Sequence, residues 1–74
     1  MTVRKAFMNN FRRLLVEKGY TMKGFAEESG FDYSNIWGWL NSRRTPNLET
    51  AFRIAKTLQV SIDDLVEGAV DDHD

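Results

Sequence analysis

The chain of 74 residues has room for one domain with one hydrophobic core, and the absence of cysteine excludes a disulfide framework and a thiolate metal site. Apolar residues make up 42% of the chain and charged residues 28%, a globular balance that excludes wholesale disorder. No apolar run approaches the roughly 20 residues of a membrane span, and the N-terminus lacks the apolar region of a secretory signal. We therefore expect a cytoplasmic protein with no membrane partner.

The net charge of −1 hides an uneven distribution of charge along the chain. Residues 1–60 carry all ten Lys and Arg residues against five acidic residues, a net charge of +5. Residues 61–74 carry six acidic residues and no Lys or Arg. A basic body suits a partner rich in phosphates, and we expect the acidic end to point away from that partner.

The first part of the chain predicts an amphipathic helix over residues 3–18, ended by Gly19. Its inward residues recur at helical spacing; they are Phe7, Phe11, Leu14 and Leu15.

Two short helices are predicted next. Thr21 is placed to cap the first of them, which carries Phe25 inward and ends at Gly30. Asp32 is placed to cap the other. The inward face of that helix is formed by Ile36, Trp39 and Leu40.

A longer helix is expected after Asn47, which can cap it. Its expected inward stripe consists of Leu48, Ala51, Phe52, Ala55 and Leu58. Ser61 and Asp64 resemble a capping box before a last short helix of about residues 62–67, which Gly68 can end.

These elements predict an all-α domain of five helices over residues 1–68, followed by an acidic disordered tail over residues 69–74. The single histidine, His73, falls in that tail, where no second nitrogen or thiolate ligand is available for a metal. We therefore expect neither a metal nor a cofactor.

The segment MKGFAEESGFDYSNIWGWLN, residues 22–41, has the spacing of a helix-turn-helix unit. Ala26 is small where two helices approach closely, Gly30 can supply the positive φ of a tight turn, and Ile36 is apolar where the third helix meets the second. With PNLETAFRIAKTLQVSIDDL at residues 46–65, the chain resembles the lambda-repressor and Cro-like family from about Phe7 to Gly68. This resemblance implies a sequence-specific transcriptional regulator, a phage or bacterial repressor that inserts its third helix into the major groove of double-stranded DNA.

The chain departs from the family at a pair of positions where members often place an Arg late in the first helix and a Glu late in the third. Here these positions hold Leu15 and Leu40. Because an apolar pair avoids the desolvation of two buried charges, the fold is expected to tolerate the exchange, with the two leucines in contact in the core.

The resemblance also implies which residues face the DNA. The base-facing positions are Tyr33, Ser34, Trp37 and Gly38. None of them has the Arg, Gln or Asn side chain of the strongest direct readers, unless Asn35 or Asn41 contributes from the margin. The residues expected to contact phosphates are Thr21, Lys23, Asn41, Arg43 and Arg44.

One such domain contacts only a few base pairs, so family members commonly bind as two-fold dimers. The resemblance places the expected homodimer interface at the last helix and the loop before it, with Ile62 and Val66 as its apolar residues.

An enzyme is not expected, because the chain has no Cys nucleophile, no His outside the tail and no Gly-rich phosphate loop. No small-molecule ligand is expected either. The alternative left open is a protein-interaction module on the same fold that binds its partner through Tyr33 and Trp37, since both residue types are common in interface hot spots.

Overall fold

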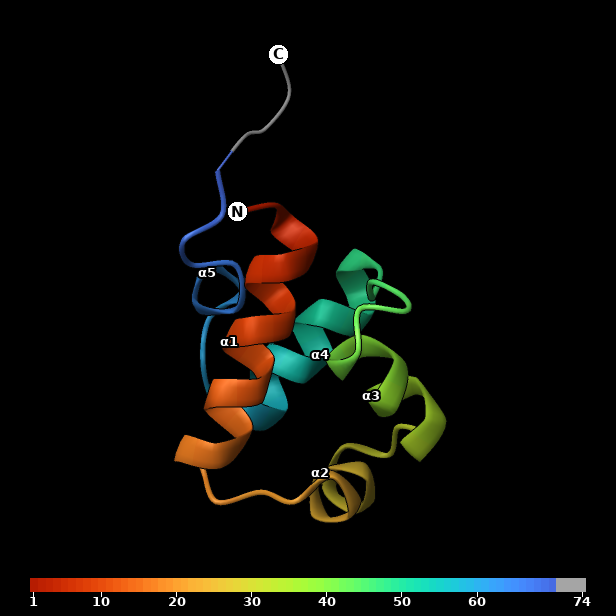
Figure 1. Cartoon of the computed structure of the whole chain (residues 1–74). Coiled ribbons are helices and arrows are strands. Elements are labelled where there is room, and N and C mark those ends of the chain that lie inside the picture. The colour runs from red at the N-terminus through yellow and green to blue at the C-terminus, as the bar shows by residue number, and fades with distance from the viewer. Residues whose placement is uncertain (71–74) are drawn as a thin grey trace.

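The computed structural model describes residues 1–70, which form five helices and no strand (Figure 1). The helices are α1 (Val3–Glu17), α2 (Met22–Ser29), α3 (Tyr33–Leu40), α4 (Leu48–Leu58) and α5 (Ile62–Leu65). The all-α prediction is therefore confirmed over this part of the chain. The last helix is shorter than expected, since it ends at Leu65 rather than near residue 67. His73 and the end of the expected tail lie outside the described residues.

Local capping interactions fix where most helices begin. The side-chain oxygens of Thr21 and Asn47 accept hydrogen bonds from the backbone N–H groups of Gly24 and Thr50, and Ser61 and Asp64 form the expected capping box. Asp32 occupies the N-cap of α3 in an extended conformation, but its side chain makes no capping hydrogen bond. The expected side-chain cap at Asp32 is therefore wrong.

The end of α1 is set by a glycine turn. Gly19 has a φ of 79°, and its N–H donates to the carbonyl of Val16. The N–H of Tyr20 reaches back to the carbonyl of Leu15 at 2.8 Å. This pair of bonds is a Schellman motif, which satisfies carbonyls that the helix leaves open.

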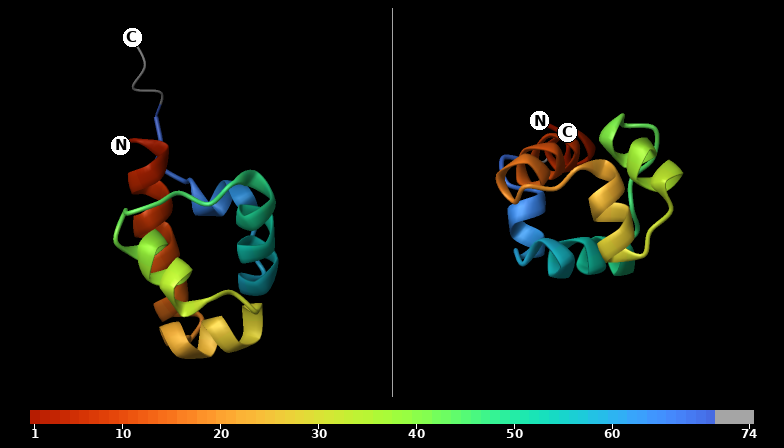
Figure 2. Two further views of the ribbon diagram at one scale, coloured as in Figure 1. Left: turned by 90° about the vertical axis from the view of Figure 1, so that its right-hand side faces the viewer. Right: turned by 90° about the horizontal axis from the view of Figure 1, so that it is seen from below.

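The five helices surround one core. In Figure 2, α3 lies beside α1, and the segment after α3 passes α1 on its way to α4. The centre of the core is aromatic: the Phe11 ring lies 5.4 Å from Phe25 and 6.4 Å from Trp39, centroid to centroid. Leu15 and Leu40 are both buried in this cluster, as expected for an apolar replacement of an ion pair.

The inward stripe of α4 differs from the expected one. Leu48 is 74% exposed and Phe52 52% exposed, whereas Ile54 is fully buried. The buried face follows the spacing of Ala51, Ile54, Ala55 and Leu58, and Leu48 and Phe52 share a flank one helical turn apart. The prediction that Leu48 and Phe52 point inward is therefore wrong.

The last helix is attached to α1 by one buried side chain and one polar side chain. Leu65 is 1% exposed and lies in the core cluster. The side-chain amide of Asn10 donates to the carbonyls of Leu65 and Glu67 at 3.1 and 2.9 Å. The segment after α5 also returns to the N-terminus, because the N–H of Val70 donates to the carbonyl of Met1.

Candidate nucleic-acid interface

Backbone and side-chain contacts hold the turn between α2 and α3. Gly30 has a φ of 82°, a conformation that costs other residues energy, and its N–H donates to the carbonyl of Ala26. Arg53 of α4 donates to the carbonyl of Ser29 at 3.2 Å and places its guanidinium 4.4 Å from the centroid of the Phe31 ring. These contacts fix the angle at which α3 leaves α2.

Helix α3 divides its residues between the core and solvent. Ile36, Trp39 and Leu40 are buried on one side. The opposite face carries the aromatic side chains of Tyr33 and Trp37, which are 53% and 46% exposed. The structure thus exposes a helix face with two aromatic rings and no acidic residue beyond the cap.

Two other residues expected at the interface also lie on this face. Ser34 is exposed between the aromatic residues along the chain. Asn41 is exposed at the end of the helix, where its side-chain amide donates to the carbonyl of Trp37 at 2.8 Å. Its amide nitrogen therefore already stabilises the end of α3.

Gly38 does not lie open on this face, because it is buried. A Cβ atom built on Gly38 would meet three side-chain atoms of Arg44 at 3.0 to 3.2 Å. The stem of Arg44 therefore occupies the space that a side chain at position 38 would fill.

The loop after α3 turns back on the helix. Ser42 adopts a positive φ of 59°, and the N–H of Arg43 donates to the carbonyl of Gly38 at 2.8 Å. The Arg43 side chain is exposed and takes part in no salt bridge within residues 1–70. The Arg44 side chain is also exposed, but its Nη1 donates a hydrogen bond to the Asn35 Oδ1 at 2.8 Å.

The start of α2 presents a second polar surface. The hydroxyl oxygen of Thr21 accepts from the N–H of Gly24 at 2.9 Å, and Lys23 is exposed in the first turn of the helix. The unbonded N–H groups of a helix N-terminus together with a nearby cation favour an anion such as phosphate.

Two arginines of α1 also lie near the loop, and the sequence analysis did not assign them to the site. Arg4 donates through Nε to the Thr45 hydroxyl at 3.1 Å, and Arg12 donates to the Leu40 carbonyl at 2.7 Å. Their positions on one helix are visible in the sequence, but only the tertiary fold brings Arg12 to the end of α3 and Arg4 to the loop after it. They add positive charge next to the segment that carries Arg43 and Arg44.

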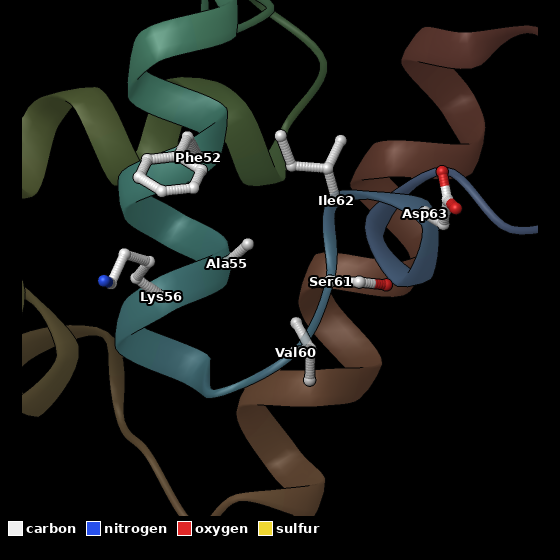
Figure 3. Close-up of a pocket in the computed structure, with 7 residues that line it drawn as sticks. All are labelled: Phe52, Ala55, Lys56, Val60, Ser61, Ile62 and Asp63. Carbon is white, nitrogen blue, oxygen red and sulfur yellow. The ribbon is translucent and has the colours of Figure 1, made fainter.

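The residues expected at the dimer interface lie on another part of the surface. Ile62 lies between two apolar hollows of about 370 and 260 Å³. Phe52 and Lys56 line the larger hollow together with Asp63, as Figure 3 shows. Leu48 and Val66 line the smaller one.

Comparison with known proteins agrees with this geometry. A family model described as helix-turn-helix matches residues 11–65. The chain belongs to the lambda-repressor and Cro-like helix-turn-helix family. Its class is therefore that of DNA-binding transcriptional regulators and not of enzymes.

A curated relative agrees with this assignment. The chain is 36% identical over 66 residues to an uncharacterized HTH-type transcriptional regulator, y4dJ, of Sinorhizobium fredii, a match that covers 89% of this chain and 86% of the relative. No solved structure matches the chain. No helix in the described part of the chain is long and apolar enough to cross a membrane.

Proposed function

We propose that the protein is a bacterial repressor that inserts α3 into the major groove of a specific operator. The observation that carries the proposal is the exposed face of α3, with Tyr33, Ser34 and Trp37 beside a basic loop. Tyr33 and Ser34 offer hydroxyl groups to base edges or phosphates, and Trp37 offers an apolar face that suits thymine methyl groups. Binding at a promoter would repress transcription by occupying the DNA.

The phosphate contacts are assigned to residues around the ends of the two helices. Arg43 is exposed in the loop after α3, and Lys23 is exposed at the start of α2. Each phosphate that such a cation neutralises contributes about 0.9 to the slope of log K against log salt concentration.

Salt dependence tests the proposal and separates it from the alternative interaction module. Binding of labelled duplex DNA is measured at several salt concentrations for the parent and for Arg43→Ala. We expect steep salt dependence in the parent and a slope smaller by about one in the variant. Arg13→Ala is the matched control, because Arg13 pairs with Glu17 at 2.9 Å on α1. A parent protein that binds no duplex at low salt would instead favour a protein partner for Tyr33 and Trp37.

We also propose that two copies pair through the apolar surface of α4 and α5. Exposed Phe52 and partly buried Ile62 supply apolar area, and Lys56 and Asp63 place opposite charges on the rim of the larger hollow. In a two-fold interface every contact occurs twice. Lys56 of each copy can therefore face Asp63 of the other copy.

Sedimentation of the parent and of Phe52→Ser tests this pairing. We expect the parent to bind a pseudo-palindromic operator as a dimer, and the folded variant to sediment as a monomer with weaker operator binding. Ile62→Ser should act in the same direction. Footprinting that shows a single asymmetric half-site would contradict the dimer.

A further inference from the structure

The exposed face of α3 carries a side chain that does not belong to the helix. Arg44 comes from the following loop, and its stem crosses α3 at Gly38 before its guanidinium reaches Asn35. Two contacts define this path: the Nε, Cγ and Cδ atoms of Arg44 lie 3.0 to 3.2 Å from the Cβ position of residue 38, and Nη1 lies 2.8 Å from the Asn35 Oδ1. Arg44 thus runs back along the helix, although it remains exposed to solvent.

Helical geometry shows which face Arg44 covers. Residues three and four apart share a helix face, so position 38 adjoins Ser34 and Asn41 on the side opposite to buried Ile36. Gly38 has no side chain there, and the Arg44 stem takes its place. The guanidinium therefore lies at the edge of the face that carries Ser34 and Trp37.

The chemistry of the guanidinium indicates what it binds. A guanidinium has five N–H donors and no acceptor, and the bond to Asn35 uses only one of them. In the major groove, guanine presents two acceptors, O6 and N7, side by side, which an arginine fork matches with two parallel hydrogen bonds. Resting against the helix, the side chain also loses less conformational freedom on binding than a free arginine does.

We infer that Arg44 is a specificity-determining residue that reads a guanine in the operator, and that Gly38 and Asn35 are positioning residues that hold it on α3. This inference rests on the proposed insertion of α3 into the major groove. It assigns Arg44 a different role from Arg43, whose side chain has no such support on the helix.

Selection of bound sequences from a random duplex pool tests the assignment. The parent should select guanine at one position of each half-site. Arg44→Ala should lose that preference by roughly 5- to 100-fold while leaving the other positions unchanged. Arg44→Lys should lose it as well, because an ammonium retains the charge but not the fork. Arg43→Ala, the neighbouring control, should weaken binding to all sequences alike.

Gly38→Ala tests the positioning role independently of charge. Alanine favours helix over glycine, and exposed Arg44 can move aside, so the variant should fold with an equal or higher melting temperature. It should still lose guanine preference, and it should have no further effect on preference in the Arg44→Ala background.

The outcomes separate this inference from the proposed function. If Arg44→Ala lowers affinity uniformly and the selected sequence is unchanged, Arg44 contacts phosphate and the inference is overturned. The same holds if Arg44→Lys keeps the full preference. If the parent selects no sequence at all, the proposed function is wrong, and the inference, which depends on it, is wrong as well.

Discussion

Helix α4 offers a matched pair of substitutions that tests which of its faces is buried. Ile54 is 0% exposed and Phe52 is 52% exposed, although they are only two residues apart. Ile54→Ala removes three buried carbon atoms, worth about 2.4 kcal/mol at about 0.8 kcal/mol for each carbon. The cavity left behind adds to this, so we expect a loss of about 3 to 4 kcal/mol in the free energy of unfolding.

Phe52→Ala removes a larger side chain, but about half of that side chain is already in water, so we expect it to cost less than about 1.5 kcal/mol in the monomer. A domain of this size has a total stability of about 4 to 11 kcal/mol, which makes the Ile54 loss a large share of it. Urea unfolding followed by circular dichroism, at concentrations where the protein is monomeric, measures both values.

The relative size of the two stability losses shows which face of α4 is buried. If Phe52→Ala destabilised the monomer as much as Ile54→Ala, the buried stripe of α4 would be the one expected from the apolar pattern, and the surface proposed for pairing would not exist. Equal slopes of the unfolding free energy against urea concentration are required for the comparison.

Three further predictions concern the core and the ends of the helices. Leu40→Glu should lower the free energy of unfolding by about 3 kcal/mol or more, because it buries an unpaired charge. Adding Leu15→Arg should recover part of this loss, as measured by urea unfolding. A double variant no more stable than Leu40→Glu alone would refute the contact between positions 15 and 40. Gln59 has a φ of 61° at the end of α4, so Gln59→Gly should raise stability by about 0.5 to 1 kcal/mol in a thermal melt, and a lower melting temperature would contradict this strain. Hydrogen bonds from Ser61 hold the pKa of Asp64 below its ordinary value. Asp64 therefore stabilises the folded state above its unfolded pKa of about 4 and loses that contribution as pH falls through the lower folded pKa, so the stability difference between the parent and Asp64→Asn should shrink on acidification; a difference independent of pH would refute the capping role.

The sequence alone determined the elements whose causes are local. Thr21 and Asn47 cap helices because a short side-chain oxygen meets a backbone N–H three residues ahead. Gly19 and Gly30 end helices because they adopt a positive φ without steric cost. Each of these interactions spans a few residues, so the pattern of residue types was sufficient to place the first four helices.

The tertiary structure decided which apolar residues are buried when a helix offers more than one apolar face. On α4, Leu48 and Phe52 fit a helical stripe as well as Ile54 does, and the choice depends on where α2 and α5 pack against the helix. Contacts between distant parts of the chain could not be predicted from local sequence patterns either. Arg4 contacts Thr45 across 41 positions of sequence, and no local pattern encodes that distance.

Helix α3 shows most clearly what the sequence determined and what the fold decided. The sequence identified Tyr33, Ser34 and Trp37 as exposed positions of α3, without a strong base-reading side chain among them, but it also counted buried Gly38 with them. Only the fold placed Arg44 over Gly38 and against Asn35, because the positive φ of Ser42 turns the loop back along the helix. Arg44 belongs to the loop in the sequence, but its side chain forms part of the surface of α3. Its position depends on backbone geometry and packing, which residue types alone do not specify.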